Sequence, residues 1–338
     1  MNQTTNSIAQ QERGHGLLSA PQLDHQTFGF LQDLMLDSSI EELWINQPGE
    51  VWFADQSGHH RILLDFSNSA LMRLIDQLLR ASGRRLDSSK PFVDATLFEG
   101  SRLHVVIPNV VREHPSLNIR KFRKTRLGLA QLVDNRSITP EQAQVLMQAL
   151  DERKSIMFSG ATHSGKTTLL TACLNEFGDH ERLVSVEDTF ELHCQVPDWV
   201  AMQTREEASS SAAVVDLRRL IRESLRMRPT RLAVGEVRGA EAAELLVALN
   251  SGVPAYFTIH ANSADAALEK LIALSLNAGE NISERFARAS FEASTSIAVH
   301  CQREGSRRFI SELVERLKRR KPTREIIART FRFHSIKP

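Results

Sequence analysis

Residues 155–174 read SIMFSGATHSGKTTLLTACL, and this stretch decides the fold of the chain. Residues 160–167 match the phosphate-binding pattern G-x-x-x-x-G-K-[ST]. The apolar run at 155–159 predicts a buried strand before the loop, and the apolar positions of 166–174 predict a helix after it. A strand, a glycine-bearing turn and a helix in this order hold the phosphates of a nucleoside triphosphate. A glycine turn that binds no nucleotide is the alternative, and the flanking strand and helix argue against it.

The loop pattern also predicts roles for single residues. Gly160 and Gly165 let the backbone turn so that its N–H groups point at phosphate oxygens. Lys166 can reach the β- and γ-phosphates, and the Thr167 hydroxyl can coordinate Mg²⁺. We therefore expect ATP and Mg²⁺ as cofactors. The residues expected to bind the nucleotide are Gly160, Ala161, Thr162, His163, Ser164, Gly165, Lys166, Thr167 and Thr168.

Apolar strands alternate with helix-length segments downstream of the loop. The predicted strands cover 182–186, 231–235 and 255–259, and the predicted helices cover 215–227, 240–250 and 263–276. This alternation favours a mostly parallel sheet covered by helices. Because ligands of such sheets bind at the carboxyl ends of the strands, polar residues at those ends are candidate site residues.

Glu187, Glu236 and His260 each stand at or just after the end of a predicted strand. Gly235 occupies the position where a Walker B strand usually carries a metal-binding aspartate, so we expect Glu236 to serve the metal together with Thr167. His260 is placed to sense the γ-phosphate or to stabilise its neighbours. A capping carboxylate and a structural histidine are the alternatives. The occurrence of all three residues in order after the loop argues against them.

The first part of the chain predicts a different organisation. Residues 1–25 are polar and lack periodicity, which predicts a flexible tail. Residues 26–125 predict a smaller α+β domain. Its expected strands are at 42–46, 50–53, 102–107 and 117–120, and its expected helix is at 70–79.

Two segments follow this first domain. Residues 126–150 predict a linker and a helix, because Thr139, Pro140 and Gln142 form a capping box at a helix start. Residues 151–338 predict the nucleotide domain with a basic C-terminal segment.

The net charge of +1 hides an asymmetry. Residues 301–338 hold 12 Lys and Arg against 4 Asp and Glu, whereas the remaining residues hold 30 against 37. The basic segment could contact an anionic membrane surface peripherally. A solvated helix face around 316–321 is the favoured interpretation. No aromatic residues interleave the cluster, which also argues against a nucleic-acid partner.

Composition predicts a cytoplasmic protein. No run reaches the roughly 18–20 apolar residues that a membrane span needs, and the polar N-terminus does not resemble a secretory signal. The 3 cysteines are too sparse for a disulfide or metal framework and fit a reducing compartment.

Taken together, these motifs resemble the boxes of the type II/type IV secretion ATPases. Residues 160–167, 187–189, 234–239 and 258–262 look like the Walker A, Asp, Walker B and His boxes of that family. The stretches that resemble its CpaF-type branch, which serves tight-adherence (Flp) pili, are 91–95, 100–108, 117–122 and 225–231. The resemblance covers roughly residues 28–315.

The resemblance implies a RecA-like P-loop ATPase core preceded by the smaller α+β domain, assembled as a homohexamer. It implies a place at the cytoplasmic side of the inner membrane, with membrane platform proteins of a pilus or secretion apparatus as partners. By position, Glu187 resembles the general base, Glu236 the Walker B acid and His260 the coupling residue. The arginines implied at the phosphates are Arg102, Arg120, Arg205 and Arg238.

One segment departs from the family pattern. Members usually carry Gly-His-x-Gly shortly before the His box, but residues 251–256 lack the histidine and the second glycine. Gly252 is retained. The local turn before His260 is therefore expected to differ, and the coupling of nucleotide state to conformation with it. Phe190 is a milder departure.

The predicted function is an ATPase that powers pilus assembly or protein secretion through a hinge motion around the connector at 123–135. A conjugative DNA-transfer or type IV secretion motor would share every catalytic residue and differ in its partners. A regulatory subunit that hydrolyses ATP slowly is the alternative favoured by the altered turn. A helicase is the alternative suggested by the basic segment, without a supporting motif.

Overall fold

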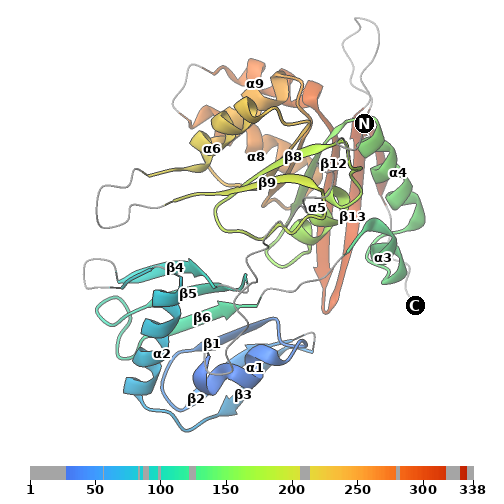
Figure 1. The fold of residues 1–338 in the computed structure, drawn as a ribbon. Helices are drawn as coiled ribbons and strands as arrows, with labels where there is room; N and C mark the ends of the chain where they lie inside the picture. The colour runs from blue at the N-terminus through green and yellow to red at the C-terminus, as the bar shows by residue number, and fades with distance from the viewer. Residues whose placement is uncertain are drawn as a thin grey trace, which may run out of the picture. The chain divides into compact units, whose positions relative to one another are not determined.

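The computed structural model describes residues 28–55, 57–82, 84–86, 91–97, 100–121, 127–205, 214–278, 282–316 and 328–332. The chain divides into two compact units, Met1–Arg123 and Lys124–Pro338, whose elements are labelled in Figure 1. The tail predicted at 1–25 and the basic residues at 317–321 lie outside the described residues.

The first unit is an antiparallel sheet covered on one face by helices. Its strand order is β3-β2-β1-β6-β5-β4. The strands are β1 (Glu42–Ile45), β2 (Glu50–Ala54), β3 (His59–Leu63), β4 (Phe92–Thr96), β5 (Arg102–Val106) and β6 (Ser116–Arg120). The helices are η1 (Gly29–Leu31), α1 (Gln32–Leu36) and α2 (Asn68–Ala81). Side chains such as Leu43, Ile119 and Leu103 pack against Leu71 and Ile75 of α2, which forms the core.

The predicted helix and the four predicted strands of this unit are confirmed. The edge strands β3 and β4 were not predicted, because their exposed, polar positions leave no apolar run to recognise. Two of the expected phosphate-binding arginines face each other in the sheet: Arg102 of β5 is the register partner of Arg120 of β6.

The second unit is built on an eight-stranded sheet of order β14-β13-β12-β7-β11-β10-β8-β9. Neighbouring strands run parallel from β12 to β9, and β13 and β14 are added antiparallel. The strands are β7 (Ser155–Gly160), β8 (Arg182–Glu187), β9 (Asp198–Gln203), β10 (Arg231–Val237), β11 (Ala255–Ile259), β12 (Thr295–Glu304), β13 (Arg307–Arg316) and β14 (Ala328–Arg332). The predicted mostly parallel sheet is confirmed.

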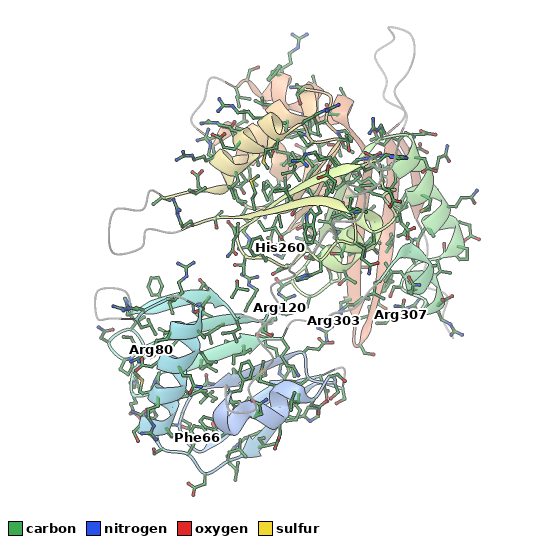
Figure 2. All side chains as sticks on the ribbon, in the orientation of Figure 1. Phe66, Arg80, Arg120, His260, Arg303 and Arg307 are labelled. Atoms are coloured by element: carbon green, nitrogen blue, oxygen red, sulfur yellow. The ribbon has the colours of Figure 1, made fainter. Side chains whose placement is uncertain are left out.

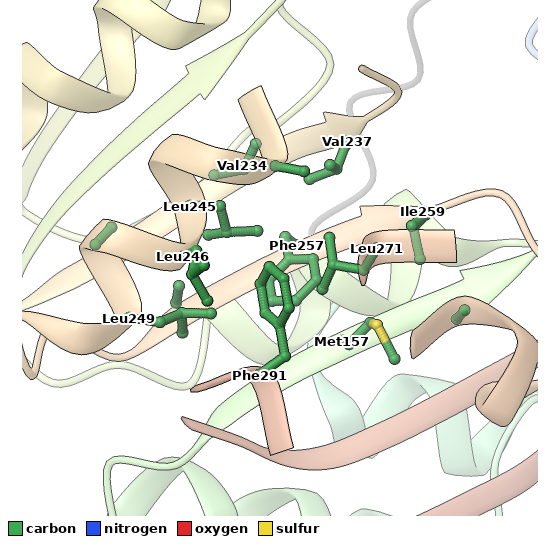
Figure 3. Packing of buried hydrophobic residues seen from close by; sticks show 14 of the residues in the cluster. Met157, Val234, Val237, Leu245, Leu246, Leu249, Phe257, Ile259, Leu271 and Phe291 are labelled. Atoms are coloured by element: carbon green, nitrogen blue, oxygen red, sulfur yellow. The ribbon is translucent and has the colours of Figure 1, made fainter. Parts of the chain in front are cut away.

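Helices pack on both faces of this sheet. They are α3 (Leu129–Asp134), α4 (Pro140–Asp151), α5 (Lys166–Leu174), α6 (Leu217–Ser224), η2 (Leu225–Met227), α7 (Glu241–Asn250), α8 (Ala264–Leu276) and α9 (Glu284–Ser294). One buried cluster joins α6 to α9 to the sheet, and Figure 3 shows Phe257 and Phe291 among its residues. A second cluster joins α3, α4 and α5 to the other face.

Local signals explain several boundaries in this unit. The Thr139 hydroxyl accepts the Gln142 N–H and the Gln142 side chain accepts the Thr139 N–H, so the predicted capping box at the start of α4 is confirmed. Strand β13 extends to Arg316 and pairs with β12 and β14, and the rest of the helix face predicted at 316–321 lies outside the described residues.

Candidate nucleotide site

The loop between β7 and α5 needs glycine at two positions. Gly160 has φ +149°, and a Cβ there would lie 2.4 Å from the Cys301 carbonyl oxygen and 2.5 Å from Ser164 Oγ. Gly165 has φ +93°, a left-handed conformation that L side chains rarely adopt. The hairpin β12–β13 supports the loop from outside, since Arg308 Nε donates to the His163 carbonyl at 3.0 Å. Both positions therefore require glycine, as the phosphate-binding pattern predicts.

Lys166 is 6 % exposed and points back across the loop. Its Nζ donates to the carbonyl oxygens of Gly160 at 3.1 Å and Ala161 at 2.8 Å. It also lies 3.2 Å from Nδ1 of His260. Thr167, the next residue of α5, directs its hydroxyl toward Glu191, with 3.5 Å between Oγ1 and Oε2.

Glu187 ends β8 and is 2 % exposed. Its Oε1 accepts the backbone N–H groups of Glu191 and Leu192, both at 2.9 Å. Its side chain also explains the missing Walker B aspartate: a Cβ at Gly235 on the neighbouring strand would lie 2.9 Å from Glu187 Cγ. Glycine at 235 therefore makes room for Glu187.

Glu236 of β10 is contacted by an arginine and a histidine side chain. Its Oε2 accepts from Arg238 at 2.8 Å, and its Oε1 lies 2.9 Å from His260 Nε2. Burial raises the pKa of Glu236, but the hydrogen bond and charge of Arg238 and the charges of His260 and Lys166 outweigh it. The pKa of this carboxyl stays below its ordinary value of 4.5, so Glu236 is an anion at neutral pH.

His260 connects the loop to Glu236. Its Nδ1 lies 3.2 Å from both Lys166 Nζ and the Gly160 carbonyl, and its Nε2 faces Glu236. Nδ1 can accept from Lys166 when it carries no proton, or donate to the Gly160 carbonyl when it carries one. The ring and its neighbours form a chain of contacts that runs Lys166–His260–Glu236–Arg238.

The four expected arginines separate into two pairs. Arg205 and Arg238 line one hollow of about 400 Å³ in the second unit, next to Asp188. The backbone of Arg205 is fixed by paired hydrogen bonds with Val215 at 2.8 and 2.9 Å. Arg102 and Arg120 lie in the first unit; Figure 2 labels Arg120 there and His260 in the second unit.

The atypical segment before His260 forms a tight helix end. The Ser251 hydroxyl donates to the Ala248 carbonyl of α7 at 2.7 Å, and Gly252 has φ +86°. The retained glycine thus makes the turn, and β11 still delivers His260 to the sheet edge. Glu191 and Arg308 contact site residues and were missed from the sequence, because neither stands at the end of an apolar strand.

Hard oxygen donors gather where Mg²⁺ is expected. Thr167 and Glu191 supply a hydroxyl and a carboxylate, the ligand types that Mg²⁺ prefers. No group of three or more His, Cys, Asp and Glu side chains suited to a metal occurs among the described residues. Magnesium here would therefore depend on bound phosphate, as is usual for nucleotide sites. Within the described ranges, no helix has the length and hydropathy to cross a membrane.

Residues 24–320 match the family model of type II/IV secretion system proteins. A Mycobacterium tuberculosis protein named for conjugal transfer is 34 % identical over 294 residues, covering 84 % of this chain and 83 % of its own. The type IV secretion system protein PtlH of Bordetella pertussis is 31 % identical over 259 residues, covering 69 % of this chain and 76 % of its own.

The fold has a solved counterpart. The ATPase DotB of Legionella pneumophila superposes with a TM-score of 0.60 at 20 % identity, covering 85 % of this chain and 80 % of DotB. The fold class is confirmed as α/β, with a RecA-like core preceded by a smaller sheet-containing region. On the family match and the relatives, the chain belongs to the type II/IV secretion system protein family.

Proposed function

We propose that this chain hydrolyses ATP and converts the energy into domain motion that powers pilus assembly or protein secretion across a bacterial envelope. The observation that carries the proposal is the chain of contacts from Lys166 through His260 to Glu236, beside the buried Glu187. All of these residues lie at the carboxyl edge of the parallel strands, where α/β proteins bind ligands.

The residues divide the chemical work between them. Lys166 can exchange its loop carbonyl contacts for phosphate oxygens by rotating its side chain. Glu187, whose direction is fixed by two N–H donors, orients and deprotonates the attacking water. His260 and Glu236 report phosphate occupancy to Arg238. When bound, Mg²⁺ neutralises the charge that develops on the phosphates.

The arginine pairs fit charge stabilisation. Like charges directly opposite each other destabilise a sheet, so the register that sets Arg102 against Arg120 fits the binding of an anion. Arg205 and Arg238 line a hollow beside Asp188 and suit the same role. We propose that the chain acts as a homohexamer in which such an arginine serves a neighbouring subunit's phosphates.

Contacts of α5 support a hinge at the connector. Asn175 Nδ2 donates to the Leu127 carbonyl at 3.0 Å, and Glu176 Oε1 accepts the Leu129 N–H at 2.7 Å. Both follow the end of α5, whose first residues bind the phosphates in our proposal. A shift of α5 on nucleotide binding would thus move the part of the connector around Leu127 and Leu129.

The names of the relatives favour a second candidate machine. One is named for conjugal transfer and another for type IV secretion, so a conjugative or type IV secretion motor is the alternative to the CpaF-type pilus branch. In both cases we propose a cytoplasmic place, peripheral at the inner membrane, with membrane platform proteins rather than nucleic acid as the direct partners of this chain. Neighbouring genes for prepilin or for relaxase would separate the two machines.

Steady-state hydrolysis tests the proposal. Purified protein with ATP and Mg²⁺ should turn over ATP, and a Lys166→Ala variant should not. Turnover no faster than that of the variant would favour a slow regulatory subunit instead. Light scattering with and without an ATP analogue tests the hexamer.

A further inference from the structure

We infer that His300 of β12 is a positioning residue for the phosphate loop, and that it acts by holding Ser159. Ser159 is the residue directly before Gly160, and its Oγ lies 2.9 Å from Nδ1 of His300. The inference rests on the proposed function, because it concerns the loop at which the nucleotide would bind.

Three polar residues lie in one row across three neighbouring strands. His300 is the register partner of Ser159 on β7 and of Glu312 on β13. Residues opposite each other in paired strands point to the same face of a sheet. On that face Glu312 Oε2 accepts the N–H of Ala264, the first residue of α8, at 3.0 Å. The row therefore runs from the residue before the phosphate loop to the start of the helix that follows His260.

The ring and the hydroxyl are buried together and share their protons. Ser159 is fully buried, and His300 is 4 % exposed. The hydroxyl has one proton, which it can donate to the Val299 carbonyl at 3.0 Å or to Nδ1 of the ring. An imidazole completes the pair in both cases, since Nδ1 accepts when bare and donates when protonated. Because a buried polar group without a partner costs free energy, this pairing fixes the orientation of Ser159.

The surroundings of His300 favour a neutral ring. Burial lowers the pKa of His300, the charge of Glu312 opposes this change, and the charge of Lys166 adds to it. The pKa therefore stays below its ordinary value of 6.5, and the ring carries no charge at neutral pH. The contribution of His300 to the loop is thus geometric and not a charge offered to the phosphates.

Strand β12 also touches the loop itself. A Cβ at Gly160 would lie 2.4 Å from the Cys301 carbonyl oxygen, so the two backbones are packed closely. The Gly160 carbonyl accepts from Lys166 Nζ at 3.1 Å and lies 3.2 Å from His260 Nδ1. A shift of Ser159 would therefore be felt by both residues that we expect to respond to the phosphates.

An irregularity in the hairpin marks the same place. The pairing of β12 with β13 skips Ser311 between the partners of His300 and Cys301. The Ser311 hydroxyl donates to the His300 carbonyl at 3.3 Å. Irregularities of this kind re-aim side chains and are common next to active sites. Here the extra residue helps to fix the backbone from which the ring projects.

Titration of a non-hydrolysable ATP analogue into the full chain tests the inference without relying on turnover. His300→Leu keeps the approximate size of the side chain and removes its hydrogen bonding. It should weaken analogue binding by about 3- to 10-fold, the factor that corresponds to the loss of one hydrogen bond. Ser159→Ala should give a similar loss. The double variant should lose no more than the weaker-binding single variant, because both changes remove the same contact.

His300→Asn separates positioning from packing. Its amide can lie near the place of Nδ1 and can donate or accept, so binding should stay within about twofold of the wild type. Asparagine is smaller than leucine and leaves more empty space, so a requirement for packing alone would make His300→Asn bind more weakly than His300→Leu. Thermal unfolding without nucleotide measures the packing cost of each variant separately.

Thr295→Val is the matched control on the same strand. Thr295 is 1 % exposed, and its hydroxyl has no hydrogen-bond partner among the described residues, so binding should not change. Unchanged binding by His300→Leu, an equal loss in His300→Asn, or an equal loss in Thr295→Val would each overturn the inference. If His300→Leu does not fold, unchanged binding by Ser159→Ala overturns it instead. Wild-type protein that binds the analogue but never hydrolyses ATP would refute the proposed function and leave this inference intact.

Discussion

Glu187 and Glu236 stand at the carboxyl ends of two adjacent parallel strands, yet they are held in opposite ways. Glu187 is almost fully buried, and backbone N–H groups fix one of its oxygens. Glu236 is held by side chains rather than by backbone, and through His260 it reaches Lys166 in the phosphate loop. A carboxylate fixed by backbone suits orienting a water molecule, and a carboxylate linked through side chains to the phosphate loop suits reporting what the loop has bound.

The largest expected effect comes from the carboxylate held by backbone. Glu187→Gln should lower turnover by about 10²- to 10⁴-fold, the range that a positioned general base contributes, while binding of an ATP analogue stays near the wild-type level. Steady-state hydrolysis and analogue titration measure the two quantities. Glu236→Gln is the matched control and should lose less. If Glu236→Gln instead abolishes turnover while Glu187→Gln stays active, the two roles are reversed.

A methyl group at Gly235 tests the steric relation between the two strands. Gly235→Ala places a Cβ 2.9 Å from Glu187 Cγ. Overpacking of this kind costs about 1–3 kcal/mol of stability, and displacement of Glu187 should also lower turnover. Denaturant unfolding and hydrolysis measure both effects. Gly178→Ala is the control, because nothing lies within 4 Å of a Cβ there and its φ is not in the left-handed region. Equal stability of the two variants would mean that Gly235 does not shape the position of Glu187.

A double-mutant cycle tests whether His260 and Glu236 act as one unit. If both residues report loop occupancy through the same contacts, the effect of His260→Ala plus Glu236→Gln on analogue affinity should fall short of the sum of the single effects by about 0.5–1.5 kcal/mol. The cycle Glu187→Gln with His260→Ala should be closer to additive, since Glu187 Oε1 is held by the backbone N–H groups of Glu191 and Leu192. Additivity in the first cycle would show that the contacts between His260 and Glu236 carry no coupling.

Much of this arrangement follows from the sequence, because its signals are local. The phosphate loop and the apolar strands before Glu187, Glu236 and His260 are continuous in sequence, and parallel strands bring their carboxyl ends to one edge. The capping box at Thr139 is likewise complete within four residues.

The sequence did not predict contacts between residues far apart in the chain, or boundaries in segments that lack periodicity and turn residues. Arg308 meets the loop from 145 residues away, and Glu191 lies in a segment without periodicity. Strand β12 begins at Thr295, directly after α9 ends at Ser294, so no turn residue marks the change. The steric reason for Gly235 is visible only when the neighbouring strand is in place.

The smallest expected effect is the pH dependence of the contacts around Glu236. Because the pKa of this carboxyl is lowered in the folded chain, its stabilising contribution is fully present above the ordinary value of 4.5 and is lost as the pH falls below it. Arg238 is half exposed, so the contribution at neutral pH should not exceed about 1 kcal/mol. Thermal unfolding of wild type and Glu236→Gln should therefore differ slightly at pH 7 and converge below pH 4.5. A difference that persists in acid would mean that the glutamine perturbs packing rather than charge. Glu236 would then be held mainly by its buried surroundings, as Glu187 is, and not by the charges of its neighbours.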